Sequence, residues 1–232
     1  MASDEISARM AEIAREVQSG DDVGQVGDRI CRAAVELLGP HTESGISIAQ
    51  RGRRVDNIGA TSVAAQRGDE LQVELREGPC LDAAWEHEQV VASDLAREDR
   101  WPQWGPRMVA DYGIKSMLCT QLFTNDRQLG ALNIYSTERD AFDDEAQEMA
   151  RVLAVHAAMA VASAQQIDGL RLANDRRTAI GKALGIIMVK YDLQDDLAFA
   201  VLQRLSSHEN RKLSDIAQDV VAARGLPGQP QT

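Results

Sequence analysis

A group of cationic, amide and hydroxyl side chains near the end of the sequence has the chemistry to bind phosphates and nucleobases. Its members are Arg204, Ser207, His208, Asn210, Arg211 and Lys212, preceded by Lys182, Gly185 and Lys190. Lysine and arginine neutralise phosphates, whereas polar and planar groups contact splayed bases, so this mixture suits a nucleic-acid surface. The alternative is a solvated charged face in which Asn210 serves only as a helix C-cap.

Three cysteines offer a second kind of chemistry. Cys31, Cys80 and Cys119 are odd in number, far apart and without CxxC spacing, which argues against a disulfide framework and a closed zinc site. Pro79 favours a helix start, which would place Cys80 in a first turn, where a thiolate is stabilised and reactive. The favoured alternative for Cys80 and Cys119 is that each is a small buried residue.

A small-molecule pocket is a third candidate site. Trp101 and Trp104 could line such a pocket together with Cys80 and Cys119, although tryptophans in an aromatic-poor segment equally suit core and lid packing. The four histidines, His41, His87, His156 and His208, have no metal-ligand spacing. We therefore expect neither a metal nor another cofactor.

The acidic charge of the chain is unevenly distributed. The 232 residues have a formal net charge of −11, yet residues 166–232 hold nine basic and eight acidic side chains. Residues 171–190 alone hold five basic side chains and one acid, so the C-terminal part has a local positive face. The apolar run 152–164 is too short to span a bilayer, and the first residues do not resemble a secretory signal. We expect a cytoplasmic protein.

The elements of the first two thirds of the chain predict an α+β fold. Apolar residues at steps of three and four predict two amphipathic helices, one over 6–17 and one ending at Gly39–Pro40. Alternation predicts one hairpin over 46–58 and another over 115–136 that turns at "NDR". A less regular middle contains short helices opened by Pro79 and Pro102 and the strand "VVASDL". The order predicts an antiparallel sheet with helices on one side, followed by a long helix from about residue 144.

The last third predicts helices only, over about 167–190, 193–208 and 213–224, with Asp192 as the N-cap of the second. On the first of these, Ile180, Ala183, Leu184, Ile187, Met188 and Tyr191 share one face, and Thr178, Lys182, Gly185 and Val189 lie opposite. Tight packing against the third helix is the favoured explanation for Gly185. A helix unbroken from 144 to 190 would be about 70 Å long, and its apolar steps from Leu170 to Ile187 would suit a dimer seam.

Two stretches of the sequence resemble known domains. The segments "EGPCLDA", "DRWPQW", "GIKSML" and "LGALNIYS" resemble the GAF domains of actinobacterial regulators. The stretch "AIGKALGIIMVKYDLQDDLAFAVLQRLSSHENRKLSDIAQDVV" resembles the ANTAR domain, a three-helix RNA-binding module of transcription antiterminators. This resemblance implies a GAF-type antiparallel sheet with helices over 1–165, a long linking helix and a three-helix ANTAR domain over 166–226. The Gly- and Pro-rich residues at the end of the sequence separately predict a disordered tail over 227–232.

The resemblance also implies a function. Proteins of this type bind RNA with two short hairpins that carry six-base loops, and they prevent a terminator from forming. Given the resemblance, RNA is favoured as the partner of Lys182, Gly185, Lys190, Arg204, Ser207, Asn210, Arg211 and Lys212. We expect a non-enzymatic regulator in which a GAF ligand or redox event shifts the population of RNA-binding states. Whether the protein is a homodimer is left open. The alternatives are a thiol enzyme that uses Cys80 and a DNA-binding regulator.

Overall fold

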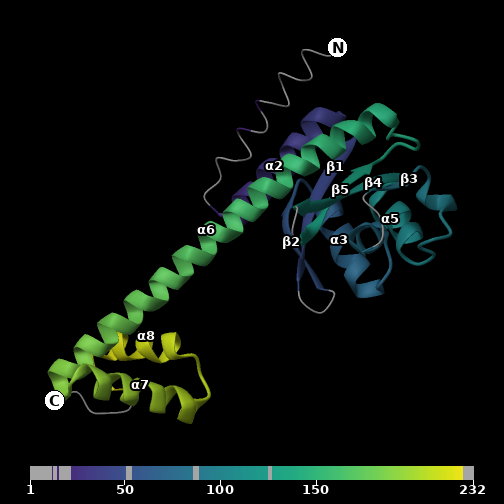
Figure 1. Cartoon of the computed structure of the whole chain (residues 1–232). Helices are drawn as coiled ribbons and strands as arrows, with labels where there is room; N and C mark the ends of the chain where they lie inside the picture. Colours follow the sequence, from purple (N-terminus) through teal and green to yellow (C-terminus); the bar gives the residue numbers. More distant parts are fainter. Residues whose placement is uncertain are drawn as a thin grey trace. The chain divides into compact units, whose positions relative to one another are not determined.

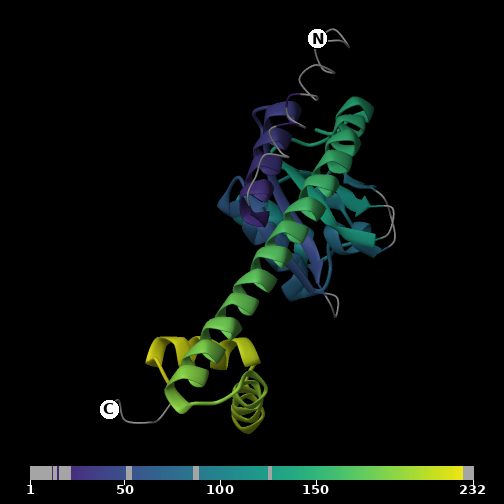
Figure 2. The same ribbon diagram turned by 60° about the vertical axis from the view of Figure 1, so that its left-hand side comes forward.

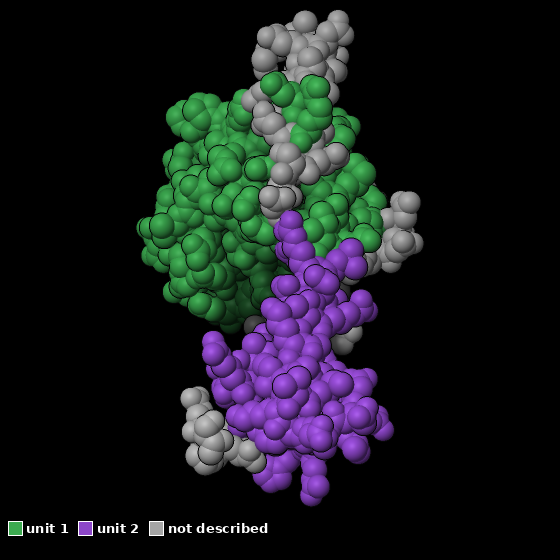
Figure 3. Space-filling view, turned by 90° about the vertical axis from the view of Figure 1, so that its left-hand side faces the viewer, with its two compact units in different colours: residues 1–167 green, residues 168–232 purple. Residues whose placement is uncertain are grey.

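The chain divides into two compact units, residues 1–167 and 168–232, which are described separately (Figure 3). The computed structural model describes residues 12, 15, 22–50, 54–85, 89–124 and 127–226. The predicted helix over 6–17, the "NDR" turn and the predicted disordered tail lie wholly or mostly outside these residues. Within them, no helix is long and apolar enough to cross a membrane.

The first unit is built on a five-stranded antiparallel sheet in the order β2-β1-β5-β4-β3. Its strands are β1 (Thr42–Gln50), β2 (Arg54–Ala60), β3 (Gln89–Ala92), β4 (Ser116–Thr124) and β5 (Arg127–Ser136). Both predicted hairpins are therefore present as β1–β2 and β4–β5. The central strand β5 pairs with β1 and β4. Its side chains alternate between the two faces, so Leu132 and Ile134 lie in one core and Ala131 and Tyr135 in the other.

Helices cover both faces of this sheet, so the expectation of helices on one side is wrong (Figures 1 and 2). One face packs against α2 (Val23–Leu38) and the first part of α6 (Asp144–Tyr191). The other face packs against α3 (Val63–Leu75), α4 (Pro79–Trp85) and α5 (Trp104–Tyr112), with the short 3-10 helix η1 (Leu95–Arg97) before α5. Alternation along β4 divides the two cores, because Leu118 faces the first and Cys119 the second.

Helix α3 was not predicted from the sequence because its inner face is polar. The helix buries Asp69 and Gln72 beside Leu71, so its apolar residues do not recur at helical steps. Two other helix starts were predicted from prolines, and one of them is correct. Pro79 opens α4 as predicted, whereas α5 begins at Trp104 and not at Pro102, which lies in the preceding turn.

The second unit is a three-helix bundle formed by the last part of α6, α7 (Asp195–Glu209) and α8 (Leu213–Ala223). The long helix from 144 is continuous to Tyr191, as predicted. The core of the bundle contains Ala183, Ile187, Ala198, Leu202, Ile216, Ala217 and Val220. The inward face of α6 is thus the one that its sequence predicts.

The turn between α6 and α7 differs from the prediction. Asp192 does not cap α7, since the N-cap residue is Gln194 and its side chain makes no capping bond. Asp192 instead adopts a left-handed conformation with φ of 50°, and the next amide, of Leu193, donates to the Met188 carbonyl at 3.2 Å. This arrangement ends α6, because a left-handed residue directly after a helix lets later amides satisfy its last carbonyls.

Candidate functional site

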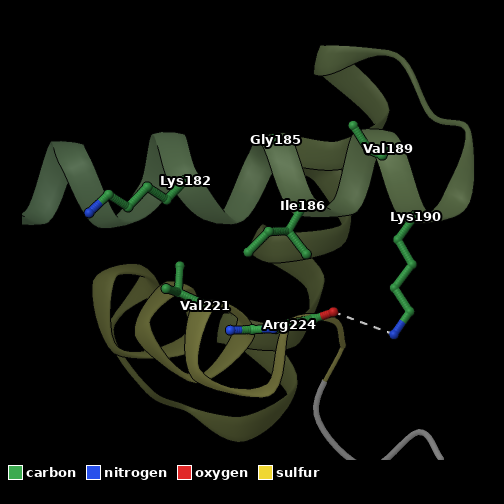
Figure 4. Close-up of a pocket in the computed structure, with 7 residues that line it drawn as sticks. All are labelled: Lys182, Gly185, Ile186, Val189, Lys190, Val221 and Arg224. Atoms are coloured by element: carbon green, nitrogen blue, oxygen red, sulfur yellow. Dashed lines mark hydrogen bonds between the residues drawn. The ribbon is translucent and has the colours of Figure 1, made fainter. Parts of the chain in front are cut away.

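A groove between α6 and α8 gathers three of the predicted residues. It is lined by Lys182, Gly185, Ile186, Val189, Lys190, Val221 and Arg224 and has a volume of about 680 Å³ (Figure 4). Lys182 and Lys190 lie two turns apart along α6, and Arg224 follows the end of α8. The lining therefore combines three cations with aliphatic side chains and contains no carboxylate.

Gly185 opens onto this groove. A Cβ built at Gly185 meets no atom within 4 Å, so the packing interpretation of this glycine is wrong. A glycine inside a helix costs about 0.5–1 kcal/mol relative to alanine, and no close approach of α8 offsets that cost here. Gly181, one turn earlier on α6, is equally open but does not line the groove.

The C-terminal end of the groove is ordered by backbone contacts. The Lys190 ammonium donates to the Arg224 carbonyl at 3.4 Å (Figure 4). The Tyr191 hydroxyl accepts from the Leu226 amide at 3.1 Å. A Cβ on Gly225 would lie 2.6 Å from the Lys190 nitrogen, so a side chain there would displace this lysine. Lys190 is thereby held at the groove by α8 and the residues after it.

The other predicted residues lie on α7 and in the turn that follows it. Arg204, Ser207, Asn210, Arg211 and Lys212 are all exposed. Asn210 is the C-cap of α7, with φ of 51° and its amide donating to the Ser206 carbonyl. Arg211 forms ion pairs with Glu209 at 3.1 Å and Asp219 at 2.7 Å, which offset its charge.

Sequence reasoning missed Val189, Ile186, Val221 and Arg224 as groove residues. The sequence places Val189 on the same face as Lys182 and Gly185, away from the core. Its side chain is 88% exposed there, which is unusual for a large aliphatic residue. Arg224 lies in a left-handed conformation at the end of α8, where its amide donates to the Val220 and Val221 carbonyls. The basic residue directly before Gly225 was the signal that could have indicated this helix end.

In the first unit, the four predicted pocket residues meet in one buried cluster. Cys80, Trp101, Trp104 and Cys119 are each no more than 2% exposed and share the core between the sheet and α3–α5. The two indole rings pack edge to face with centroids 6.0 Å apart. Each indole nitrogen donates a hydrogen bond, from Trp101 to Asp82 at 2.8 Å and from Trp104 to the Gly68 carbonyl at 3.0 Å.

A buried carboxylate, Asp69, adjoins this cluster. One carboxylate oxygen accepts from Ser47 and Asn57, both at 2.8 Å, and the other accepts from Asn133 at 2.8 Å and Tyr135 at 2.5 Å. Burial raises the pKa of Asp69 above its ordinary value, although these four hydrogen bonds lower it. Asp69 therefore joins β1, β2, α3 and β5 through one polar centre.

The polar centre extends through Gln72 to the backbone of Cys80. The Gln72 amide nitrogen donates to the Tyr135 hydroxyl at 3.5 Å, and the Cys80 amide donates to the Gln72 oxygen at 2.6 Å. Burial, reinforced by the neighbouring Cys80, raises the pKa of the Cys119 thiol well above its ordinary value. Cys119 is consequently a protonated thiol near neutral pH, which does not favour a thiolate mechanism at this residue.

No group of three or more histidine, cysteine or acidic residues within the described part of the chain could hold a metal ion. The same described residues contain the three free cysteines, each buried. The first unit offers a buried polar and aromatic core beside its sheet. The chemistry of the second unit is that of a cationic, partly apolar surface.

The fold and these two sites define a protein with an α+β sensor-type domain and a helical domain that presents cations. Residues 20–162 match the GAF domain family, so the chain belongs to that family, and residues 168–221 match the ANTAR domain. The order is a GAF domain followed by an ANTAR domain. No curated protein matches the chain.

Solved structures share the fold of the first unit at low sequence identity. The GAF domain of an Acinetobacter phosphoenolpyruvate-protein phosphotransferase has a TM-score of 0.57 at 13% identity, over 73% of this chain and 99% of that one. The corresponding domain from Coxiella burnetii has a TM-score of 0.54 at 16% identity, over 71% and 96%. The free methionine-R-sulfoxide reductase of Neisseria meningitidis has a TM-score of 0.53 at 16% identity, over 72% and 95%. These similarities establish the GAF fold alone.

Proposed function

We propose that this protein is a transcription antitermination regulator whose ANTAR domain binds RNA with paired hairpin loops under the control of its GAF domain. The match to a GAF domain followed by an ANTAR domain supports the class of regulator. The observation that carries RNA binding is the groove between α6 and α8, with its three cations and no carboxylate in the lining. Such a surface suits a polyanion that also presents apolar base faces.

The proposed RNA surface combines the groove with the turn after α7. Lys182, Gly185 and Lys190 would contact RNA from α6, and Arg204, Ser207 and Lys212 from α7 and the residues after it. Asn210 and Arg211 were also predicted to contact RNA. We assign Asn210 first to capping α7, and Arg211 a weaker contribution because two carboxylates already pair with it.

Binding of a two-hairpin RNA tests the proposal. The double variant Lys182→Gln with Lys190→Gln should bind at least about tenfold more weakly than the native protein. The linear dependence of log affinity on log salt should also become shallower, by about 0.7 for each phosphate that the variant no longer neutralises. The matched control is Arg107→Gln with Lys115→Gln, which removes the same charge from exposed positions of the first unit.

Two results would reject this function. The first is an equal loss of RNA affinity in both double variants, because net charge alone would then account for the interaction. The second is competition by duplex DNA as strong as that by the hairpin RNA, which would favour the DNA-binding alternative. RNA recovered with the protein from its own cells would identify the regulated transcript.

Helix α6 supports a homodimer within this proposal, but not along the whole seam predicted from Leu170 to Ile187, because Ile187 is buried in the core of the bundle. Its buried residues in the first unit, such as Ala157 and Val161, cover one side of the helix. Val152, Val155 and Met159 lie on the other side at steps of three and four, and they are 37%, 50% and 46% exposed. An apolar helix stripe of this spacing pairs well with a second copy of itself about a two-fold axis. Two copies would present two ANTAR domains to two hairpins.

The GAF domain is the proposed sensor, and its buried cluster is the proposed place of a small ligand or of a redox event. We propose that such a signal shifts the population of RNA-binding states in the cytoplasm. The thiol-enzyme alternative is not supported by the burial of Cys80 and Cys119. A lack of methionine sulfoxide reduction by the native protein, with retained RNA binding in Cys80→Ser, would separate the regulator from that enzyme.

A further inference from the structure

We propose that the groove between α6 and α8 is the seat of one unstacked base from an RNA hairpin loop. In this arrangement the Arg224 guanidinium covers the base, and Lys182 and Lys190 hold the flanking phosphates. This inference rests on the proposed RNA-binding function and adds the place and chemistry of recognition. It also adds Arg224, Val189 and Val221 to the contacts expected from the sequence.

The dimensions of the groove fit a nucleotide. Its volume of about 680 Å³ lies within the range of pockets that hold small organic ligands, which is about 300–1,000 Å³. The two lysines are eight residues apart on α6, so they are about 12 Å apart along the helix axis. Consecutive phosphates on the two sides of a splayed nucleotide are separated by a smaller distance than this. Lysine side chains are long enough to turn inward and reach them in the proposed complex.

The lining offers separate contacts for a base and for phosphates. Ile186, Val189 and Val221 supply apolar surface, and Val189 is left 88% exposed. A base face removes such surface from water, whereas phosphate does not. The groove lining contains no aromatic side chain, so the planar group available for stacking is the guanidinium of Arg224. Figure 4 shows Arg224 and Val221 on the side of the groove that faces Ile186 and Gly185.

Gly185 sets the space that remains for the base. Outside its own stretch of helix, no atom lies within 4 Å of its Cβ position, so a side chain added there starts without a clash and extends into the groove. Gly181 gives an equal helix environment outside the groove, since its Cβ position is also open. The two glycines therefore separate an effect of filling the groove from an effect on the helix.

The first experiment compares Gly185→Leu with Gly181→Leu. Leucine favours helix more than glycine does, so both variants should unfold at the same temperature as the native protein or higher. Gly185→Leu should bind a two-hairpin RNA at least about tenfold more weakly, while Gly181→Leu should stay within about twofold of the native affinity. Gly185→Ala should lie between them.

The second experiment locates the base. Hairpin RNAs that carry 2-aminopurine at one loop position at a time should show a protein-induced fluorescence change at one position that greatly exceeds the others. Arg224→Lys keeps the positive charge but removes the planar guanidinium group, so it should abolish the fluorescence change. The overall affinity of Arg224→Lys should fall less than that of Gly185→Leu.

The outcomes separate this inference from the function on which it rests. Failure of the native protein to bind the hairpin RNA would reject the proposed function itself. Native RNA binding with equal affinity in Gly185→Leu would reject the groove and leave the function standing. An unchanged 2-aminopurine signal in Arg224→Lys would overturn the stacking role of Arg224. A protein segment bound in the groove in place of RNA would overturn the inference as well.

Discussion

Asp69 is a buried carboxylate whose surroundings make its charge state matter for the first unit. Four hydrogen-bond donors surround its two oxygens, and Gly45 allows the close approach, because a Cβ there would lie 2.8 Å from one of those oxygens. Burial raises the pKa of Asp69 despite these bonds. A carboxyl with a raised folded pKa stabilises the fold fully below its unfolded pKa, and this contribution is lost as pH rises through the folded value.

Asp69→Asn should therefore have an effect on stability that depends on pH. At acidic pH, near the unfolded pKa, the variant should be less stable by about 1–3 kcal/mol. The reason is that the NH2 group of the new asparagine would face the hydrogen-bond donors that surround Asp69. The difference from the native protein should shrink as pH rises, since only the native protein loses stability through ionisation of Asp69. Denaturant unfolding of the first unit across this pH range measures both effects. Exposed Asp111→Asn is the control, and a difference for Asp69→Asn that is constant with pH would contradict the expectation.

At the scale of elements, the end of α7 distinguishes a structural role from a binding role. Asn210 holds a left-handed conformation, which glycine adopts freely and which alanine adopts at a cost of about 1–2 kcal/mol. Asn210→Gly should keep the native free energy of unfolding and the native RNA affinity, whereas Asn210→Ala should be less stable by about 1 kcal/mol. Thermal unfolding and RNA titration of both variants measure this. A stable Asn210→Gly variant that no longer binds RNA would instead make Asn210 a direct contact.

The elements also show what the sequence could predict. Strands β1, β4 and β5 and the inner face of α6 were predictable because apolar side chains recur at the period of the element, as Ile46 and Ile48 do in β1. Helix α3 was not predictable in this way, because Asp69 and Gln72 occupy its inner face. The cap at Asp192 failed for a local reason, since this residue ends α6 with a positive φ and does not begin α7.

The candidate site was predictable only in part. The cations on α6 were evident from charge and helical period, and the structure brings Lys182, Gly185 and Lys190 into one groove. The contribution of α8 was not evident, because Val221 and Arg224 come near these residues only through the packing of the bundle. Tertiary neighbours of this kind are not encoded in the spacing along one helix.

For the whole molecule, the proposed dimer predicts a link between assembly and RNA affinity. Val155→Glu with Met159→Glu places two charges on the exposed stripe of α6 and should give a monomer by light scattering. The variant should bind single-hairpin RNA normally but bind two-hairpin RNA at least about tenfold more weakly, since the second contact is no longer intramolecular. Ala96→Glu with Ala110→Glu adds the same charge at exposed positions elsewhere in the first unit and should change neither property.

Three results would count against the dimer in this form. Unchanged molecular mass in the Val155 and Met159 variant would place the interface elsewhere. A stronger dimer after removal of residues 1–21 would indicate that this segment, with its predicted apolar face at Ile6, Met10, Ile13 and Val17, covers the stripe in the native protein. Equal loss of single-hairpin and two-hairpin binding would show that the charges act on the RNA surface and not on assembly.

The positions of the three cysteines allow their modification rates to report local opening of the GAF domain. Cys31 lies in the core on the α2 side of the sheet, Cys80 and Cys119 lie in the core on the opposite side, and all three are buried. The second unit contains no cysteine. A thiol reagent can modify these residues only when a core opens, so modification rates measure local opening of each layer of the GAF domain. A compound that slows modification of Cys80 and Cys119 more than that of Cys31 would be recognised as a GAF ligand without any knowledge of the RNA.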